Sequence, residues 1–165
     1  METSASDRPV KILLVEDNPV DARMTLYALR EEKTWLTDVV VVDDGENAIR
    51  YLIEQSSSTS GAIPDLVILD LNLPKWDGTE VLRTIRTTTG LEKLPVVIFT
   101  SSPAEVSESI VRQANLQANC YMAKPANADD FLSIGHVFRV LSEAAMAGAS
   151  QPITTDCLAE TARAH

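Results

Sequence analysis

Four aliphatic residues in a row, Leu66 to Leu69, stand between Pro64-Asp65 and Asp70. A run of Leu and β-branched residues bounded in this way predicts a strand buried on both faces, which is typical of the centre of a parallel sheet. Asp70 would then lie at the carboxyl end of the strand, the edge at which ligands bind in open α/β sheets. This stretch alone leaves two interpretations open, a site residue or a cap of the following loop.

Similar apolar runs recur along the chain, and helical patterns separate them. We predict buried strands at 10–15, 39–42, 66–69, 95–99 and 120–122, and helices at 19–32, 46–53, 79–87, 104–113 and 127–147. Strands that alternate with helices imply an α/β fold with a parallel sheet, right-handed crossovers and helices on both faces.

The helix boundaries have recognisable signals. Ser102-Pro103-Ala104-Glu105 combines an N-cap residue, a proline at the first helical position and a capping-box Glu, so we expect a helix to begin there. The Ser-rich stretch 55–61 is expected to be a polar surface loop.

Composition excludes several classes of protein. The 165 residues, 45% hydrophobic and 23% charged, are typical of one soluble domain. No apolar run approaches the roughly 20 residues of a membrane span, and the first residues lack the features of a secretory signal, so we expect a cytoplasmic protein. Cys120 and Cys157 show neither metal-ligand nor disulfide spacing. A net charge of -10 argues against nucleic acid as a partner.

The residues that we single out as a candidate site follow four of the predicted strands. Glu16-Asp17 follows the first strand and Asp70 the third. These carboxylates would meet at one edge of the sheet and need a cation nearby, because like charges about 4 Å apart repel by roughly 4 kcal/mol at an effective dielectric of about 20. Carboxylates without His or Cys nearby favour a hard, partly hydrated divalent ion, of which Mg²⁺ is the best match. Thr100 and Lys124 follow the other two strands and add a hydroxyl and a positive charge. Together these groups suit phosphoryl transfer to a carboxylate.

In this order the motifs resemble the receiver domains of two-component response regulators, of which the single-domain chemotaxis regulator is the best-known member. The resemblance covers about residues 10–146 and depends on Glu16-Asp17, on 70–74 with Asp77-Gly78, on Thr100, and on Tyr121 with Lys124-Pro125. It implies a flavodoxin-like, doubly wound (βα)5 fold with strand order 2-1-3-4-5. The receiver domain would span 10–147, between tails at 1–9 and 148–165.

The resemblance also implies a role for each site residue. Asp70 would accept a phosphoryl group from a histidine kinase. Asp17 and Asp70 would ligate Mg²⁺ with the main-chain carbonyl of Asn72, and Glu16 would act through a metal-bound water. Lys124 would pair with one phosphoryl oxygen, and Thr100 would donate a hydrogen bond to another.

Two further features follow from the resemblance alone. Tyr121 matches the aromatic residue that moves inward when the Thr100 hydroxyl is drawn to the phosphate, the alternative being a packed strand residue. The bond between Lys124 and Pro125 is expected to be cis, which costs an X-Pro bond only about 0.5–1 kcal/mol.

The type of response regulator is a separate question. The run 117–121 before Lys124-Pro125, the Ser-rich loop and the absence of an output domain resemble the short regulators that pair with bacterial phytochrome kinases. Output would then be protein contact, phosphotransfer or competition for the kinase. Two alternatives stay open: an aspartate-nucleophile hydrolase of the haloacid dehalogenase type, although Asn72 stands where its general acid is expected, and a degenerate receiver that docks partners without phosphorylation.

The last predicted helix has a wide apolar arc. One stripe is expected to pack on the sheet, and a second stripe beside it predicts a homodimer, since two-fold pairing lets one patch bury itself. The alternatives are that helix 104–113 shields the second stripe, or that its members are scattered exposed residues. The first stripe is Phe131, Ile134, Phe138, Leu141 and Ala145, and the second is Val137, Val140 and Ala144.

Overall fold

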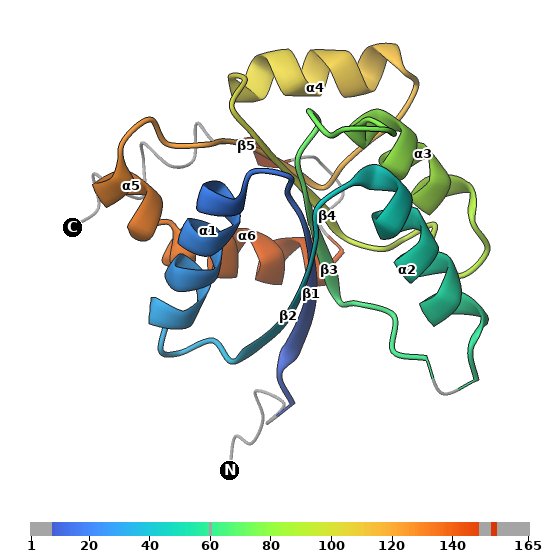
Figure 1. Ribbon diagram of the computed structural model, residues 1–165, viewed down its shortest axis with the longest axis horizontal. Coiled ribbons are helices and arrows are strands. Elements are labelled where there is room, and N and C mark those ends of the chain that lie inside the picture. Colours follow the sequence, from blue (N-terminus) through green and yellow to red (C-terminus); the bar gives the residue numbers. More distant parts are fainter. Residues whose placement is uncertain (1–7, 60, 149–152, 155–165) are drawn as a thin grey trace.

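One parallel sheet forms the centre of the protein (Figure 1). The computed structural model describes residues 8–59, 61–148 and 153–154. Within these residues the strand order is β2-β1-β3-β4-β5-β6, so the expected order of the first five strands is confirmed. The strands are β1 (Val10–Val15), β2 (Thr37–Val42), β3 (Leu66–Leu69), β4 (Val96–Thr100), β5 (Cys120–Ala123) and β6 (Ile153–Thr154).

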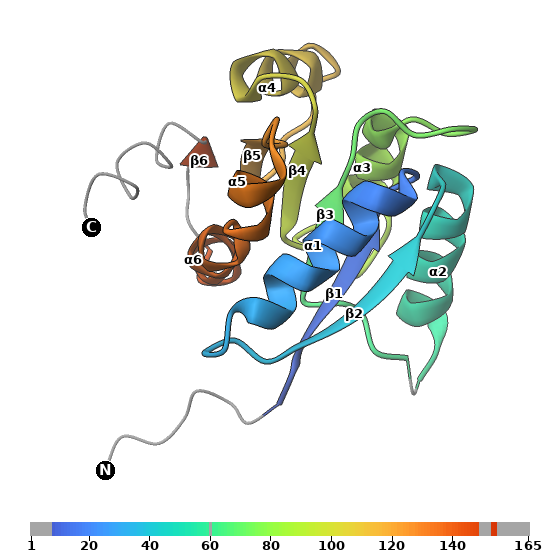
Figure 2. The ribbon, with the colours of Figure 1, turned by 60° about the vertical axis from the view of Figure 1, so that its left-hand side comes forward.

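Helices cover both faces of the sheet (Figure 2). Each face has its own apolar core. On one face lie α1 (Pro19–Glu31), α5 (Ala128–Leu132) and α6 (Gly135–Met146). On the other lie α2 (Gly45–Ser57), α3 (Gly78–Thr87) and α4 (Ala104–Gln113). No helix in the described ranges is long and apolar enough to cross a bilayer.

The central strands and the edge strand β2 differ in burial. Every residue of β3 and β4 is buried, as the aliphatic runs predict. The prediction that 39–42 is buried is wrong, because Val40 and Val41 are 38% and 40% exposed. Among the described strands β2 has one neighbour, β1, and so lies at the edge of the sheet, where the helices on the two faces cover it incompletely.

The C-terminal segment expected to be a tail contributes a strand. β6 pairs in parallel with β5, with Cys120 opposite Ile153 and Tyr121 opposite Thr154. Residues 1–7 of the expected N-terminal tail and Cys157 lie outside the described residues.

The single helix expected at 127–147 is two helices, α5 and α6, separated at Ser133 and Ile134. The reason lies in how closely α6 approaches α1. A Cβ atom at Gly135 would lie 2.0 Å from the carbonyl oxygen of Ala28, so only glycine fits at this contact. The break turns the chain so that α5 and α6 both pack beside α1 (Figure 2).

Two helix boundaries also differ from expectation. Ser102 does not cap α4: the N-cap position is Pro103, which makes no side-chain capping bond, because the helix begins one residue later than the motif implies. A complete capping box occurs instead at α3, where the Asp77 side chain accepts from the Glu80 N–H and the Glu80 side chain accepts from the Asp77 N–H. α2 continues to Ser57, so the Ser-rich loop is shorter than 55–61.

Candidate functional site

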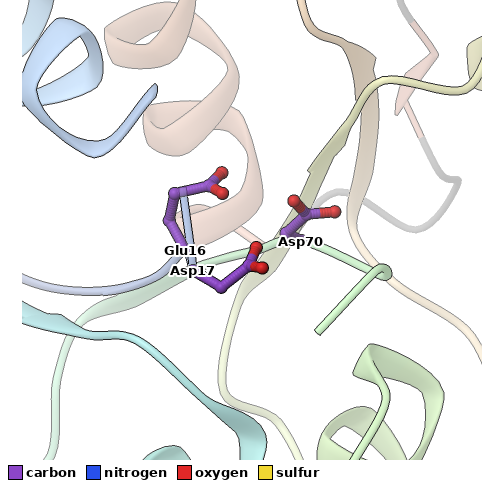
Figure 3. A group of neighbouring side chains, drawn as sticks. All are labelled: Glu16, Asp17 and Asp70. Atoms are coloured by element: carbon purple, nitrogen blue, oxygen red, sulfur yellow. The ribbon is translucent and has the colours of Figure 1, made fainter. Parts of the chain in front are cut away.

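Three carboxylates meet at the carboxyl ends of β1 and β3 (Figure 3). The two strands are neighbours in a register that sets Val15 opposite Leu69, so the residues that follow, Glu16 and Asp70, leave the sheet side by side. Ligand oxygens of Glu16, Asp17 and Asp70 all lie within 4.8 Å of one another. Glu16 and Asp70 are buried and Asp17 is exposed, so the cluster is open to solvent on the Asp17 side.

The Lys124 ammonium, delivered by β5, lies in the same cluster. Its Nζ is 2.6 Å from Glu16 Oε2, 2.9 Å from Asp70 Oδ2 and 2.9 Å from Asp21 Oδ2. The Lys124 side chain is 6% exposed. This one buried cation therefore neutralises part of the charge of three carboxylates.

Burial and charge shift the titration of the site. Burial raises the pKa of Glu16 to about 6, although hydrogen bonds from Lys124 and from the Asn18 N–H oppose the rise. Burial disfavours the charged form of Lys124 as well, but its hydrogen bonds to Glu16, Asp21 and Asp70 outweigh this and raise the pKa of the ammonium. Lys124 is therefore a permanent positive charge at physiological pH.

The second oxygen of Asp70 has its own donors. The Thr100 hydroxyl, at the end of β4, donates to Asp70 Oδ1 at 2.7 Å, and the Asn72 N–H donates to the same oxygen at 3.0 Å. The Asn72 side-chain amide donates in turn to the Thr100 hydroxyl at 3.2 Å. Asp70 thus has both carboxylate oxygens hydrogen-bonded, one to the lysine and one to the hydroxyl and a main-chain amide.

Close packing shapes the loop that follows Asp70. A Cβ atom at Gly78 would lie 2.4 Å from the Asp70 carbonyl oxygen, so the return of the chain beside the site requires glycine. The Gly78 N–H donates to the Leu71 carbonyl at 3.0 Å. Lys75, at φ 65°, ties the same loop to the start of α2 through Asp44 at 3.2 Å.

Tyr121 does not share these contacts. Its ring is buried in the core, and its hydroxyl accepts a hydrogen bond from the Ala118 N–H at 3.0 Å. Ala118 precedes β5, so the hydroxyl is engaged toward the opposite end of the strand from Lys124. In this conformation Tyr121 is a packed strand residue, and its role as a moving switch stays a prediction.

The bond between Lys124 and Pro125 is trans, so the expectation of a cis bond is wrong; no peptide bond in the part of the chain that the structure describes is cis. Trans is the intrinsically preferred isomer of an X-Pro bond by about 0.5–1 kcal/mol.

Sequence reasoning missed two contributors, Asp21 and the side chain of Asn72. Asp21 lies in the first turn of α1, where an acidic residue is common because it favours the positive end of the helix, but it also contacts Lys124. Helical side chains tilt toward the N-terminus of their helix, so an acid in the first turn of a helix that begins at the site reaches back into it. The position of Asp21 in the first turn of α1 was the available signal.

The donor set suits a hard divalent cation. Carboxylate and carbonyl oxygens are the ligands that Mg²⁺, Ca²⁺ and Mn²⁺ take, whereas zinc sites generally use His or Cys. The cluster provides oxygen ligands only. The buried Lys124 ammonium and the Thr100 hydroxyl both contact the Asp70 carboxylate. This is the arrangement needed to neutralise a phosphoryl group that arrives at Asp70.

Fold and site together define a class of signalling domain: residues 12–134 match the model of the response regulator receiver domain, and the chain belongs to this family. It is 36% identical over 129 residues to the response regulator Rcp1 of Synechocystis sp., a match that covers 78% of this chain and 86% of Rcp1. The family match favours the receiver over the haloacid dehalogenase alternative.

Solved structures agree with this assignment. The phosphorylated cyanobacterial phytochrome response regulator RcpA is 38% identical with a TM-score of 0.70, and the match covers 81% of this chain and 94% of that one. The Mn²⁺-bound form of Rcp1 is 34% identical with a TM-score of 0.68, and the match covers 79% of this chain and 92% of that one. Receiver domains bind a divalent metal and are phosphorylated by histidine kinases.

Proposed function

We propose that this protein is a single-domain response regulator that accepts a phosphoryl group from a histidine kinase on Asp70, in a Mg²⁺-dependent reaction. The observation that carries the proposal is the environment of the Asp70 carboxylate. One of its oxygens faces Lys124 at 2.9 Å, the other faces the Thr100 hydroxyl at 2.7 Å, and the Glu16-Asp17 pair lies beside them.

The chemistry divides among the residues of the chain. An Asp70 oxygen forms a bond to phosphorus while the bond from phosphorus to the kinase imidazole nitrogen breaks. The electron pair of that bond stays on the nitrogen, and the imidazole leaves as a neutral ring because its other nitrogen carries a proton. Lys124 pairs with one phosphoryl oxygen and Thr100 donates to another. Their positive charge and donor are needed because phosphorylation adds about -1.5 to -2 charge to an acidic site.

Asp17, Asp70 and the main-chain carbonyl of Asn72 would hold Mg²⁺, with Glu16 acting through a water molecule. The ion, when bound, supplies charge neutralisation for the transferring phosphoryl group. The exposure of Asp17 supports this assignment, because Mg²⁺ usually keeps several of its waters.

The partner proposed for this chain is a histidine kinase of the bacterial phytochrome type. The support is its similarity to RcpA and Rcp1, of which RcpA is described as a phytochrome response regulator.

We propose further that the receiver domain spans 10–147 and that the protein acts in the cytoplasm. It does not act on nucleic acid, and it signals by phosphorylation-dependent protein contact or phosphotransfer. Its only chemistry is the gain and loss of its own phosphoryl group. It pairs with a second copy through α6.

Intact-mass measurement after incubation with Mg²⁺ and a small phosphodonor tests the phosphorylation. The expected result is one phosphoryl adduct on the wild type and none on Asp70→Asn, with the same circular dichroism spectrum for both. Turnover of the phosphodonor without an adduct would favour a hydrolase. No adduct and no turnover would favour a degenerate receiver that only docks partners.

A further inference from the structure

Lys124 has no hydrogen-bond donor to spare in this structure. An ammonium group carries three N–H bonds, and Lys124 Nζ contacts three carboxylates, those of Glu16, Asp21 and Asp70. Contact with a phosphoryl oxygen therefore requires that Lys124 breaks its hydrogen bond to one of these carboxylates.

The three carboxylates are not equally placed to do so. The side chains of Glu16 and Asp70 are 1% and 6% exposed, whereas that of Asp21 is 24% exposed. Glu16 and Asp70 also belong to the cluster proposed to hold the metal, and Asp21 does not. Asp21 is thus the partner whose loss leaves neither a buried charge unpaired nor the metal without a ligand, since water can solvate its carboxylate.

We infer that Asp21 is a positioning residue that holds the Lys124 ammonium on the α1 side of the site before phosphorylation and competes with the phosphoryl group for it. The inference depends on the proposed function, because it concerns how the same site responds to a phosphoryl group. On phosphorylation, the hydrogen bond from Lys124 to Asp21 is replaced by a hydrogen bond to a phosphoryl oxygen, and the Asp21 carboxylate turns to solvent.

A structural role for Asp21 is the competing explanation. Its N–H donates to the Asn18 side chain at 3.2 Å, and its carboxylate lies in the first turn of α1, where negative charge favours the helix dipole. That role would change the thermal stability of the protein. It would not change the relative affinities of the site for a metal and for a phosphoryl mimic.

The test uses the full chain, beryllofluoride as a mimic of the phosphoryl group, and calorimetric titration at saturating Mg²⁺. Asp21→Asn removes the competing charge, so we expect it to bind beryllofluoride about two- to fivefold more tightly than the wild type, the range that fits a partly exposed ion pair. In a separate titration without beryllofluoride, its Mg²⁺ affinity should be unchanged or weaker. Asp21→Glu keeps the carboxylate and should behave as the wild type.

Asp43→Asn is the matched control for net charge, because Asp43 is an exposed carboxylate that follows β2 at the same edge of the sheet and is not one of the Lys124 partners. Asp21→Ser is an independent second variant that places a small uncharged side chain in the first helical turn. Like Asp21→Asn, it should bind beryllofluoride more tightly than the wild type.

The outcomes separate the two proposals. A wild type that binds beryllofluoride as tightly as Asp21→Asn and Asp21→Ser overturns the role of Asp21 alone. An equal gain in Asp43→Asn overturns it too, since the effect would then be one of long-range charge. A wild type that forms no phosphoryl adduct and binds no beryllofluoride overturns the proposed function itself, and the role of Asp21 with it.

Discussion

At the level of single residues, the charge balance around Lys124 decides how the site behaves without a metal. Four carboxylates, of Glu16, Asp17, Asp21 and Asp70, gather around or beside one ammonium. An unpaired buried charge costs several kcal/mol, so the ammonium stabilises the fold as well as preparing the site for a phosphoryl group. The same ammonium competes with any cation for Glu16 and Asp70.

Lys124→Met should therefore have opposite effects on stability and on metal binding. Without divalent metal, we expect the free energy of unfolding to fall by about 3 kcal/mol, because Glu16 and Asp70 lose their buried counter-ion. Urea denaturation should show a smaller loss with Mg²⁺ present, and Mg²⁺ affinity should rise. Lys93→Met, at an exposed lysine, is the control for lost charge. Weaker Mg²⁺ binding by Lys124→Met would contradict this account.

The raised pKa of Glu16 predicts a pH dependence of stability. Its pKa is about 6 in the folded protein against 4.5 ordinarily, so the folded state binds the proton more tightly. The contribution of Glu16 to the stability of the metal-free protein should then fall as the pH rises from 4.5 through 6, and level off once Glu16 is fully deprotonated in the folded state. Urea denaturation across this range should show the slope in the wild type but not in Glu16→Gln. Identical pH profiles would contradict the shift.

At the level of elements, the contact between α1 and α6 fixes how the last part of the chain packs. Gly135 begins α6 at the point where the helix meets the main chain of Ala28. The buried stripe expected on the last helix is confirmed, but it is divided between α5, which carries Phe131, the intervening turn, which carries Ile134, and α6.

Gly135→Ala should test this contact. A methyl group there would lie 2.0 Å from the Ala28 carbonyl oxygen, so the helices must separate, and we expect a loss of about 2 to 3 kcal/mol, typical of overpacking. Thermal or urea unfolding measures the loss. In the control, Gly90→Ala, the added methyl meets nothing within 4 Å, so only the positive φ of 90° is penalised, by about 1 to 2 kcal/mol. A stable Gly135→Ala would mean that the helices can move apart freely.

At the level of the whole molecule, the second apolar stripe of α6 is the surface predicted to contact another copy of the chain. Shielding by α4 is excluded, because α4 packs on the opposite face of the sheet. Val140 is 41% exposed, and Val137 and Ala144 beside it are partly buried. The homodimer therefore stays a prediction, with scattered exposed residues as its remaining alternative.

Val140→Arg should weaken self-association through α6. An arginine at the centre of the second stripe would be desolvated in a two-fold contact, so light scattering should show a dimer for the wild type and a monomer for the variant. Val106→Arg places the same charge at a similarly exposed valine of α4 and should leave the dimer intact. A wild type that is monomeric at high concentration, with and without phosphodonor, would contradict the prediction.

The sequence alone was sufficient for the strand order, by resemblance, and for most of the site. Aliphatic runs mark the central strands because both their faces are covered, and the residue after such a run must leave the core at the edge of the sheet. Glu16, Asp17, Asp70, Thr100 and Lys124 were predicted on this basis, and the structure brings all five together.

Tertiary structure decided what depends on contacts between distant segments. The exposure of β2 depends on its place at the edge of the sheet, and the division of α5 from α6 depends on the approach of α1 at Gly135. The third partner of Lys124 is Asp21, which lies 103 residues away in sequence. Local sequence patterns determine which segments form buried strands and where the chain turns. The partner of a charged group is determined instead by which segments the fold brings within hydrogen-bonding distance.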